Sequence, residues 1–330
     1  MPLGKWFRTL CLPRIVLLIF AIYVSTSRAA GDGFPPISSE ELRMKSEPAA
    51  PGASAIILYH QVDRDDDGRG TMHEDNYLRI KILTEEGRKH ADVELQFAKS
   101  REEIVHINGR TIRPDGSVVN FDGKVFEKSL VKTKKIGYAA KTFTLPDVEV
   151  GGIIEYSYTV NFLGQYIYDS HWILSEELFT KRAQFSLKPY TSPYSSINLH
   201  WSWQGLPPGS EPRNGPDHII RMETTNVPAF NEEDFMPPAN ELKSRVEFIY
   251  EDELPDSSPE KYWQRVGKQR YALLEKFIGK RKAMEKLISP SDTQEIKLQK
   301  IYNRVQGIRN KSYEISKTEQ EDKRDKEKVD

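Results

Sequence analysis

An acidic stretch carries side-chain types and spacing that can bind calcium. The segment "DRDDDGRGTMHE" (63–74) fits the pattern D-x-D-x-D-G-x5-E, in which carboxylates surround the ion. The candidate ligands are Asp63, Asp65, Asp67 and Glu74. In the helix-flanked form of this loop the eighth position is apolar, whereas here it is Gly70. Because carboxylates and glycine also suit a hairpin turn, we interpret the stretch as an exposed turn, and the sequence leaves calcium binding open.

The side chains that commonly act as nucleophiles or zinc ligands are not spaced for that chemistry. The sequence contains 7 His and 1 Cys, and the histidines show neither H-x-x-H nor H-E-x-x-H spacing. The cysteine, Cys11, lies near the start of the chain, and no G-x-S-x-G motif offers serine in its place. We therefore predict no catalytic, cofactor-binding or metal-ligating residues.

Paired carboxylates and tryptophans allow a second set of hypotheses. Glu155 and residues 232–234 could form an acid–base pair of the glycosidase kind, but without a pocket that raises one pKa we interpret them as surface charge. Trp201 and Trp203 could stack on a sugar. They share a predicted strand face with Leu199, which favours core packing.

The first residues are typical of an export signal. Basic residues precede the apolar run "IVLLIFAIYV" (15–24), and Ala29 has the small side chain that signal peptidase prefers. A helical membrane span needs about 20 apolar residues, more than this run supplies. We predict a signal peptide over 1–29, periplasmic or extracellular export, and no membrane span after cleavage. Retention of the signal as an anchor stays open.

Most of the remaining chain shows the alternation of β-strands. Residues 30–54, rich in Pro, Gly, Ser and charge, predict a flexible linker. In "IIEYSYTV" (153–160), the period-two pattern places Ile154, Tyr156 and Tyr158 inward and Glu155 outward. The run "INLHWSW" (197–203) likewise places Leu199 and Trp201 inward and His200 in solvent.

Turn-forming residues separate the strands. They are "NG" at 108–109, "PDG" at 114–116 and "GG" at 151–152. Many short strands with frequent turns predict a mainly β fold, an antiparallel β-sandwich over 55–250. The Pro-rich segment 226–241 is interpreted as a loop crossing one end of the sandwich, with a contact surface for a following domain as the alternative.

The spacing of the apolar residues changes near residue 256 from the alternation of a strand to the spacing of a helix. Two amphipathic helices are predicted, over about 258–278 and 292–308, with Leu298, Ile301 and Val305 on the apolar stripe of the second. The final residues are nearly all charged and cannot contribute to a core. We predict a short helical C-terminal segment over 251–330, less stable than the sandwich.

Several ordered blocks resemble a known family. They are "RIKILTEEGRKHADVEL", "NGRTIRPDGSVVNF", "LPDVEVGGIIEYSY" and "TTNVPAFNEEDFMPPANELKSRVEFIY". Residues 55–250 thus resemble a bacterial exported domain, domain-of-unknown-function family 3857, which commonly precedes a transglutaminase-like core. "EIKLQKIYNRVQGIRNKSYE" resembles the first helix of that core. The resemblance implies a cysteine nucleophile, a histidine and an aspartate in the core, and residues 251–330 are interpreted as its truncated start.

Two classes of function remain open. In the first, the chain is a non-catalytic exported β-sandwich that supports or targets a transglutaminase-like, cysteine peptidase-like domain. In the second, it is a free-standing module that binds a glycan or a protein, with or without calcium. A net charge of −1 with interspersed signs argues against nucleic acid and leaves a protein or cell-envelope partner. The sequence does not identify the ligand, substrate or oligomeric state.

Overall fold

The computed structural model describes residues 34–67, 72–132, 137–164, 167, 169–191, 197–252, 258–278 and 286–307. The chain divides into two compact units, Met1–Pro36 and Ile37–Asp330, and the description below concerns the second. The predicted signal peptide and the charged C-terminal tail lie outside the described residues.

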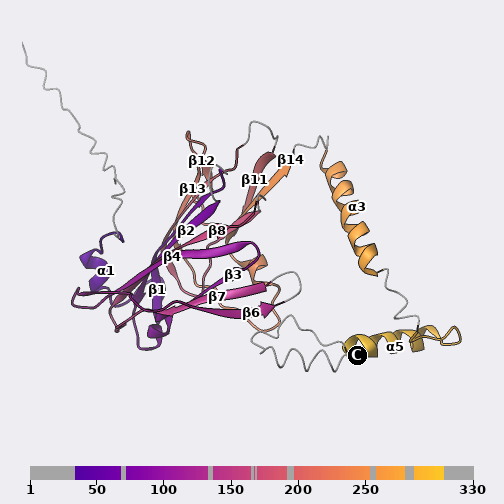
Figure 1. Ribbon diagram of the computed structural model, residues 1–330, viewed down its shortest axis with the longest axis horizontal. Helices are drawn as coiled ribbons and strands as arrows, with labels where there is room; N and C mark the ends of the chain where they lie inside the picture. The colour runs from indigo at the N-terminus through magenta and orange to yellow at the C-terminus, as the bar shows by residue number, and fades with distance from the viewer. Residues whose placement is uncertain are drawn as a thin grey trace, which may run out of the picture. The chain divides into compact units, whose positions relative to one another are not determined.

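The core of the fold is an eight-stranded sheet with the order β12-β13-β10-β1-β2-β8-β4-β5 (Figure 1). Its strands are β12 (Arg213–Asn214), β13 (Ile220–Val227), β10 (Thr180–Lys188), β1 (Ala55–Asp65), β2 (His73–Ile82), β8 (Ile153–Phe162), β4 (Glu102–Ile112) and β5 (Val118–Asn120). Neighbouring strands pair antiparallel except β1 and β10, which are parallel. The predicted mainly β, largely antiparallel sandwich is confirmed.

Two small sheets pack on one face of this large sheet. One has the order β3-β7-β6 and the other β11-β14-β9. Their strands are β3 (Asp92–Ala98), β7 (Gly137–Thr144), β6 (Phe126–Lys132), β11 (Ile197–Gln204), β14 (Arg245–Asp252) and β9 (Ser170–Ile173). Ile80 and Ile154 join Phe143 of the first small sheet in one core, and Phe185 joins Trp172 and Phe248 of the second in another.

The burial predicted from the alternation of apolar and polar residues is largely confirmed. Ile154 and Tyr156 are buried, and Tyr158 packs partly buried against the same core. Leu199 and Trp201 are partly buried against the second core. Trp203 was expected on the same face, but it lies near the end of β11, an edge strand, and its side chain is 47% exposed.

The opposite face of the large sheet is covered at one end by residues 37–54, which we call the N-terminal strap. This strap contains the short helix α1 (Ser39–Arg43), closed by a capping box between Ser38 and Glu41. Ile37, Leu42 and Met44 pack against a third apolar cluster that includes Ile56 and Ile153. Residues 37–54 of the predicted 30–54 linker thus pack against the sheet, because their scattered apolar side chains reach a sheet that is apolar on both faces at this end.

Two of the three predicted turns are present, and the third segment lies within a strand. "PDG" forms a turn in which the Gly116 N–H donates to the Arg113 carbonyl, and "GG" leads into β8 with Gly151 at φ 84°. "NG" instead lies within β4, where the pairing with β8 shifts register between Val105 and Asn108. Gly109 is needed there for space, because a Cβ would stand 2.5 Å from Leu145 Cδ2.

The two helices predicted after residue 256 are present in the structure. α3 spans Pro259–Ile278, and α5 spans Gln294–Gln306 with Thr293 as its N-cap. Leu298 and Val305 are 61% and 50% exposed, and no described residue of α5 is buried. Among the described residues, no helix combines the length and apolar character that crossing a membrane would need.

Candidate functional site

The acidic stretch forms the end of the β1–β2 hairpin, and its carboxylates point to opposite faces of the sheet. Arg64 pairs directly with Glu74, so these two side chains share one face while Asp63 and Asp65 lie on the other. Asp63 accepts a hydrogen bond from Ser186 Oγ at 2.5 Å. The pattern's ligands are thus separated by the alternation of the strand.

The remaining carboxylates of the hairpin bind neighbouring side chains. Lys188 Nζ lies 3.1 Å from Asp65 Oδ2 and 2.5 Å from Asp67 Oδ2. Glu74 lies 3.7 Å from Arg64. Within the described residues, no cluster of three or more His, Cys, Asp or Glu side chains is arranged to hold a metal ion. The described carboxylates therefore act in cross-strand pairing.

Asp66, which the calcium pattern skips, is more deeply buried than its neighbours. It accepts hydrogen bonds from Arg64 Nε and from the Tyr250 hydroxyl, both at 2.9 Å. Burial raises the pKa of the Asp66 carboxyl, an effect that the positive charge of Arg64 opposes. The guanidinium of Arg64 also lies 4.2 Å from the centre of the Phe162 ring. This cluster ties the hairpin to β14 of the small sheet.

Glu155, predicted to be a surface charge, is completely buried. Its carboxylate accepts hydrogen bonds from Arg79 Nε at 2.7 Å and Arg110 Nε at 2.6 Å, and a further one from the Tyr77 hydroxyl. The outward assignment is wrong because the face that the alternation makes polar lies beneath the N-terminal strap. Arg79 and Arg110 stand opposite Glu155 on the two adjacent strands, so the strand register creates the network.

Two basic residues of β2 hold the strap onto the sheet. Arg79 donates to both carboxylate oxygens of Glu41, at 2.9 and 3.1 Å. The fully buried Lys81 donates to the carbonyls of Leu42 and Gly151, at 2.7 and 2.6 Å, and burial lowers the pKa of its amine to about 8. Neither residue was expected from the sequence to have this role. The sequence indicated only that predicted strands carry side chains of opposite charge.

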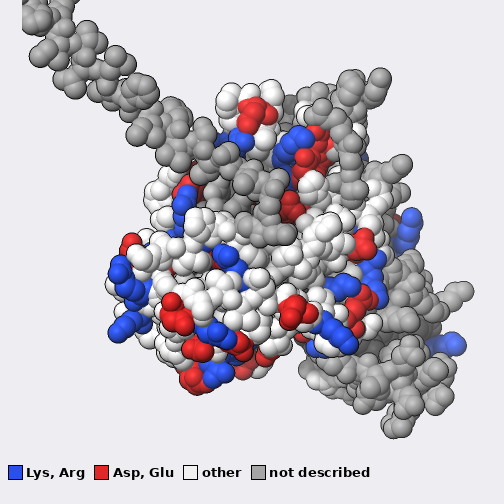
Figure 2. Space-filling model, turned by 60° about the vertical axis from the view of Figure 1, so that its left-hand side comes forward, with Lys and Arg blue, Asp and Glu red and all other residues white. Residues whose placement is uncertain are grey.

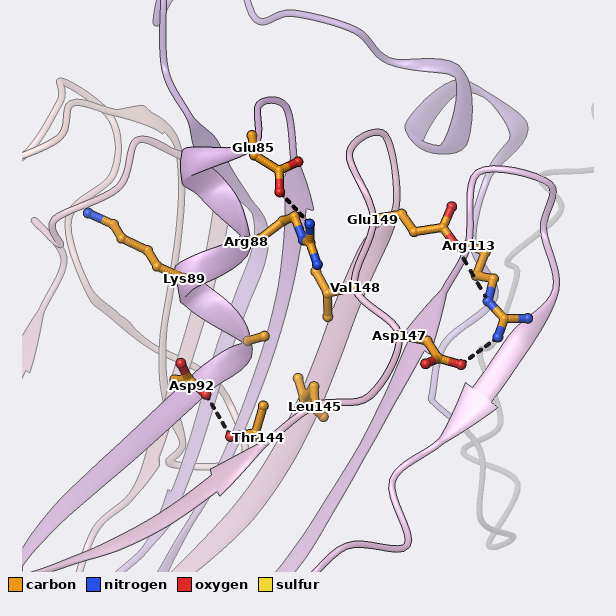
Figure 3. Close-up of a pocket in the computed structure, with 11 residues that line it drawn as sticks. Glu85, Arg88, Lys89, Asp92, Arg113, Thr144, Leu145, Asp147, Val148 and Glu149 are labelled. Carbon is orange, nitrogen blue, oxygen red and sulfur yellow. Dashed lines mark hydrogen bonds and ion pairs between the residues drawn. The ribbon is translucent and has the colours of Figure 1, made fainter.

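The described surface has a groove of about 990 Å³ beside the helical turn η1 (Glu86–Ala91) (Figure 3). Figure 3 shows Leu145 and Val148 between two charged sides, with Arg88 on one and Arg113 on the other. The floor is apolar because it consists of a leucine and a valine, and both side chains are buried. The groove is therefore an open trough with charged rims.

Most charged side chains of the groove contact a charged or polar neighbour. Arg113 lies 2.5 Å from Asp147 and 3.8 Å from Glu149. Arg88 pairs with Glu85, and Asp92 accepts a hydrogen bond from Thr144 at 2.6 Å. The groove is therefore lined by charged side chains that contact one another or their immediate neighbours.

The other side chains considered from the sequence lie apart from this groove. His200 and residues 232–234 are exposed, as expected. The buried histidine is His60, whose imidazole packs edge-on against Phe185 and whose pKa burial lowers to about 4. On the face shown in Figure 2, acidic and basic side chains are interspersed and form no single-sign patch.

Comparisons with known proteins give a family and a fold. A family model described as a domain of unknown function with solved structure, DUF3857, matches residues 68–231. No curated protein matches the chain. A solved structure from Parabacteroides distasonis, named as a candidate protease, has a TM-score of 0.53 at 15% identity and is matched over 77% of this chain and 50% of that one.

This chain thus spans about half the length of the Parabacteroides protein, and at this identity the likeness shows the fold alone. Yeast LTA4 hydrolase in complex with bestatin is also matched, with a TM-score of 0.30 and 12% identity over 67% of this chain and 36% of that one. A TM-score at this level carries no argument about fold or function.

Proposed function

The chain carries the domain of unknown function DUF3857 over residues 68–231, and from this premise we propose that it is a non-catalytic module that supports a transglutaminase-like, cysteine peptidase-like domain. The observation that carries the proposal is the shared fold with half of a candidate protease. The match covers 50% of that chain, which is consistent with a supporting role for the matched part beside a separate catalytic part.

The chemistry of the described residues supports the same role. Cleavage or transfer at an amide needs an activated nucleophile, a base for its proton and donors for the oxyanion. The sequence has 1 Cys, which precedes the sandwich, and both arginines of the groove are ion-paired. The buried ion network around Glu155 fixes the strap to the sheet, which is the arrangement of a rigid scaffold.

The proposal is tested by isolating the complex formed at native expression level. We expect the purified chain alone to leave fluorescently labelled casein intact, and we expect a peptidase-like polypeptide, joined to it or bound to it, to be recovered from its own cells. Recovery of the chain with no peptidase-like polypeptide would count against the supporting role.

We also propose that the chain is exported. The basic and apolar N-terminal residues up to Ala29 support this. Mass spectrometry of the exported protein should find an N-terminus at or near Ala30. Recovery of intact Met1 in the membrane fraction would instead indicate an anchor.

A further inference from the structure

A strained turn in the loop between β13 and β14 presents an aromatic side chain to solvent. The Met236 N–H donates to the Glu233 carbonyl at 3.3 Å, which closes a four-residue turn over 233–236. Phe235 occupies the third position with φ 65°. A left-handed third position is the mark of a type II turn, where glycine or asparagine is preferred.

Phe235 is unfavourable at this position for two reasons. A bulky side chain in the left-handed region carries backbone strain, which folded proteins retain mainly where a functional constraint opposes it. The side chain is also 105% exposed, so within the described residues no packing compensates for the strain. An exposed phenylalanine alone is ordinary, but one held at a strained position is not.

The turn is anchored on both sides. Before it, the Phe230 N–H donates to the Glu176 carbonyl at 2.8 Å. After it, Lys243 lies 3.7 Å from Glu232 and 5.5 Å from the centre of the Phe230 ring. Two prolines, at 237 and 238, restrict the backbone between these anchors. A fixed turn loses little conformational entropy when it binds a partner.

The charges around Phe235 define the kind of partner. Glu233 and Asp234 precede it and are exposed, so the aromatic ring stands beside negative charge. A complementary surface has an apolar pocket with lysine or arginine at its rim. The same carboxylates repel an anionic membrane surface, which argues against a lipid as the partner.

We propose that residues 232–236 form a docking turn, in which Phe235 enters an apolar pocket with a basic rim on a partner protein. Resting on the function proposed above, the partner is the peptidase-like domain that this module supports. The strain at Phe235 is then retained because the side chain serves the interface rather than the fold.

The first test measures the stability of the chain alone. Phe235→Gly relieves the left-handed strain, so the midpoint of thermal unfolding should stay unchanged or rise by up to about 4 °C. The control is Phe126→Gly, because Phe126 is 63% exposed but lies in strand β6, where glycine weakens the structure and the midpoint should fall. A clear fall for Phe235→Gly would show that the residue serves the fold, and would overturn the inference.

The second test is photo-crosslinking in cells that make the chain at native level. p-Benzoyl-phenylalanine placed at position 235, and at position 126 as control, is irradiated, and the joined peptides are identified by mass spectrometry. We expect at least about tenfold more product from position 235, joined to one peptide with apolar and basic residues. A further variant carries p-benzoyl-phenylalanine at position 235 together with Glu233→Lys and Asp234→Lys, while Glu232 stays paired with Lys243. Its yield of crosslinked product should be about tenfold lower, equivalent to about 1.4 kcal/mol.

The outcomes separate this inference from the proposed function. Equal yields from the two positions, products joined to lipid, or products joined to another copy of the chain would each overturn the docking turn. Products joined to a basic-rimmed pocket on a protein without a peptidase-like domain would support the docking turn and contradict the supporting function.

Discussion

Removing the carboxylate of Glu155 should strongly destabilise the fold. The side chain of Glu155 is 0% exposed, and it accepts hydrogen bonds from Arg79 and Arg110, whose side chains are 6% and 19% exposed. Glu155→Ala leaves both guanidinium groups without this partner. Arg110 can turn toward water, whereas Arg79 stays buried and retains Glu41.

The size of the effect follows from this asymmetry. Breaking a buried ion pair by removing one partner costs about 3–5 kcal/mol, because an uncompensated charge is left inside the protein. Since one of the two guanidinium groups can be rehydrated and the other keeps a carboxylate, we expect the lower end, about 3 kcal/mol. Glu155→Gln keeps the shape and an acceptor oxygen and should cost less.

The matched control is a glutamate on the same face of the same sheet. Glu223 pairs with Arg182 Nε at 2.9 Å, but these side chains are 53% and 51% exposed. Exposed pairs contribute about 0–1 kcal/mol, so Glu223→Ala should change little. Urea unfolding at 25 °C and pH 7, followed by tryptophan fluorescence and circular dichroism, gives both values.

A loss below about 1 kcal/mol for Glu155→Ala, or one equal to that of Glu223→Ala, would refute the role of the network. If the alanine variant does not fold, Glu155→Gln still decides the question. The double variant Glu155→Ala with Arg79→Ala should lose less than the sum of the single losses, since the second change removes the buried guanidinium that has lost Glu155.

Three further predictions concern pH and stability. Burial lowers the pKa of His60 from 6.5 to about 4, so the unfolded state binds the proton at a higher pH than the folded state does. The free energy of unfolding should therefore fall by up to about 3 kcal/mol as pH drops from 6.5 to 4. Urea titrations at each pH measure this loss, and His60→Leu should remove it. Burial raises the pKa of the Glu176 carboxyl from 4.5 to about 7, which gives a pH dependence of the opposite sign. Its contribution to the free energy of unfolding is present below pH 4.5 and is lost as pH rises through 7, and Glu176→Gln should abolish this dependence on pH. Limited proteolysis should cut within α3 or α5 before any strand of the large sheet, because the helices expose residues such as Leu274 and Leu298; equal resistance along the chain would contradict this.

The strand pattern was predictable from the sequence because alternation depends only on neighbouring residues. Ile154 and Tyr156 were assigned inward on this basis, and they are buried. The same rule failed for Glu155, since alternation assumes that one face of each strand meets water. The strap covers that second face, and a covering segment cannot be recognised without the sheet that it covers.

The pairing of distant residues could not be predicted from one sequence. Arg79 and Glu155 lie in separate strands, and only the register of β2 against β8 brings them together. The Phe235 turn was hidden for another reason, because "EDFM" (233–236) carries none of the glycine or asparagine that marks a type II turn. Residue preferences could not predict this turn, because its third residue departs from the preference on which such a prediction rests.

The most direct test of the supporting function is an acyl-transfer assay of the purified chain. A labelled primary amine is offered with a glutamine-rich acceptor protein, at the pH and temperature at which a reference transglutaminase is active. We expect no incorporation above that of a reaction without the chain. Incorporation that saturates with acceptor concentration and scales with the amount of chain would contradict it.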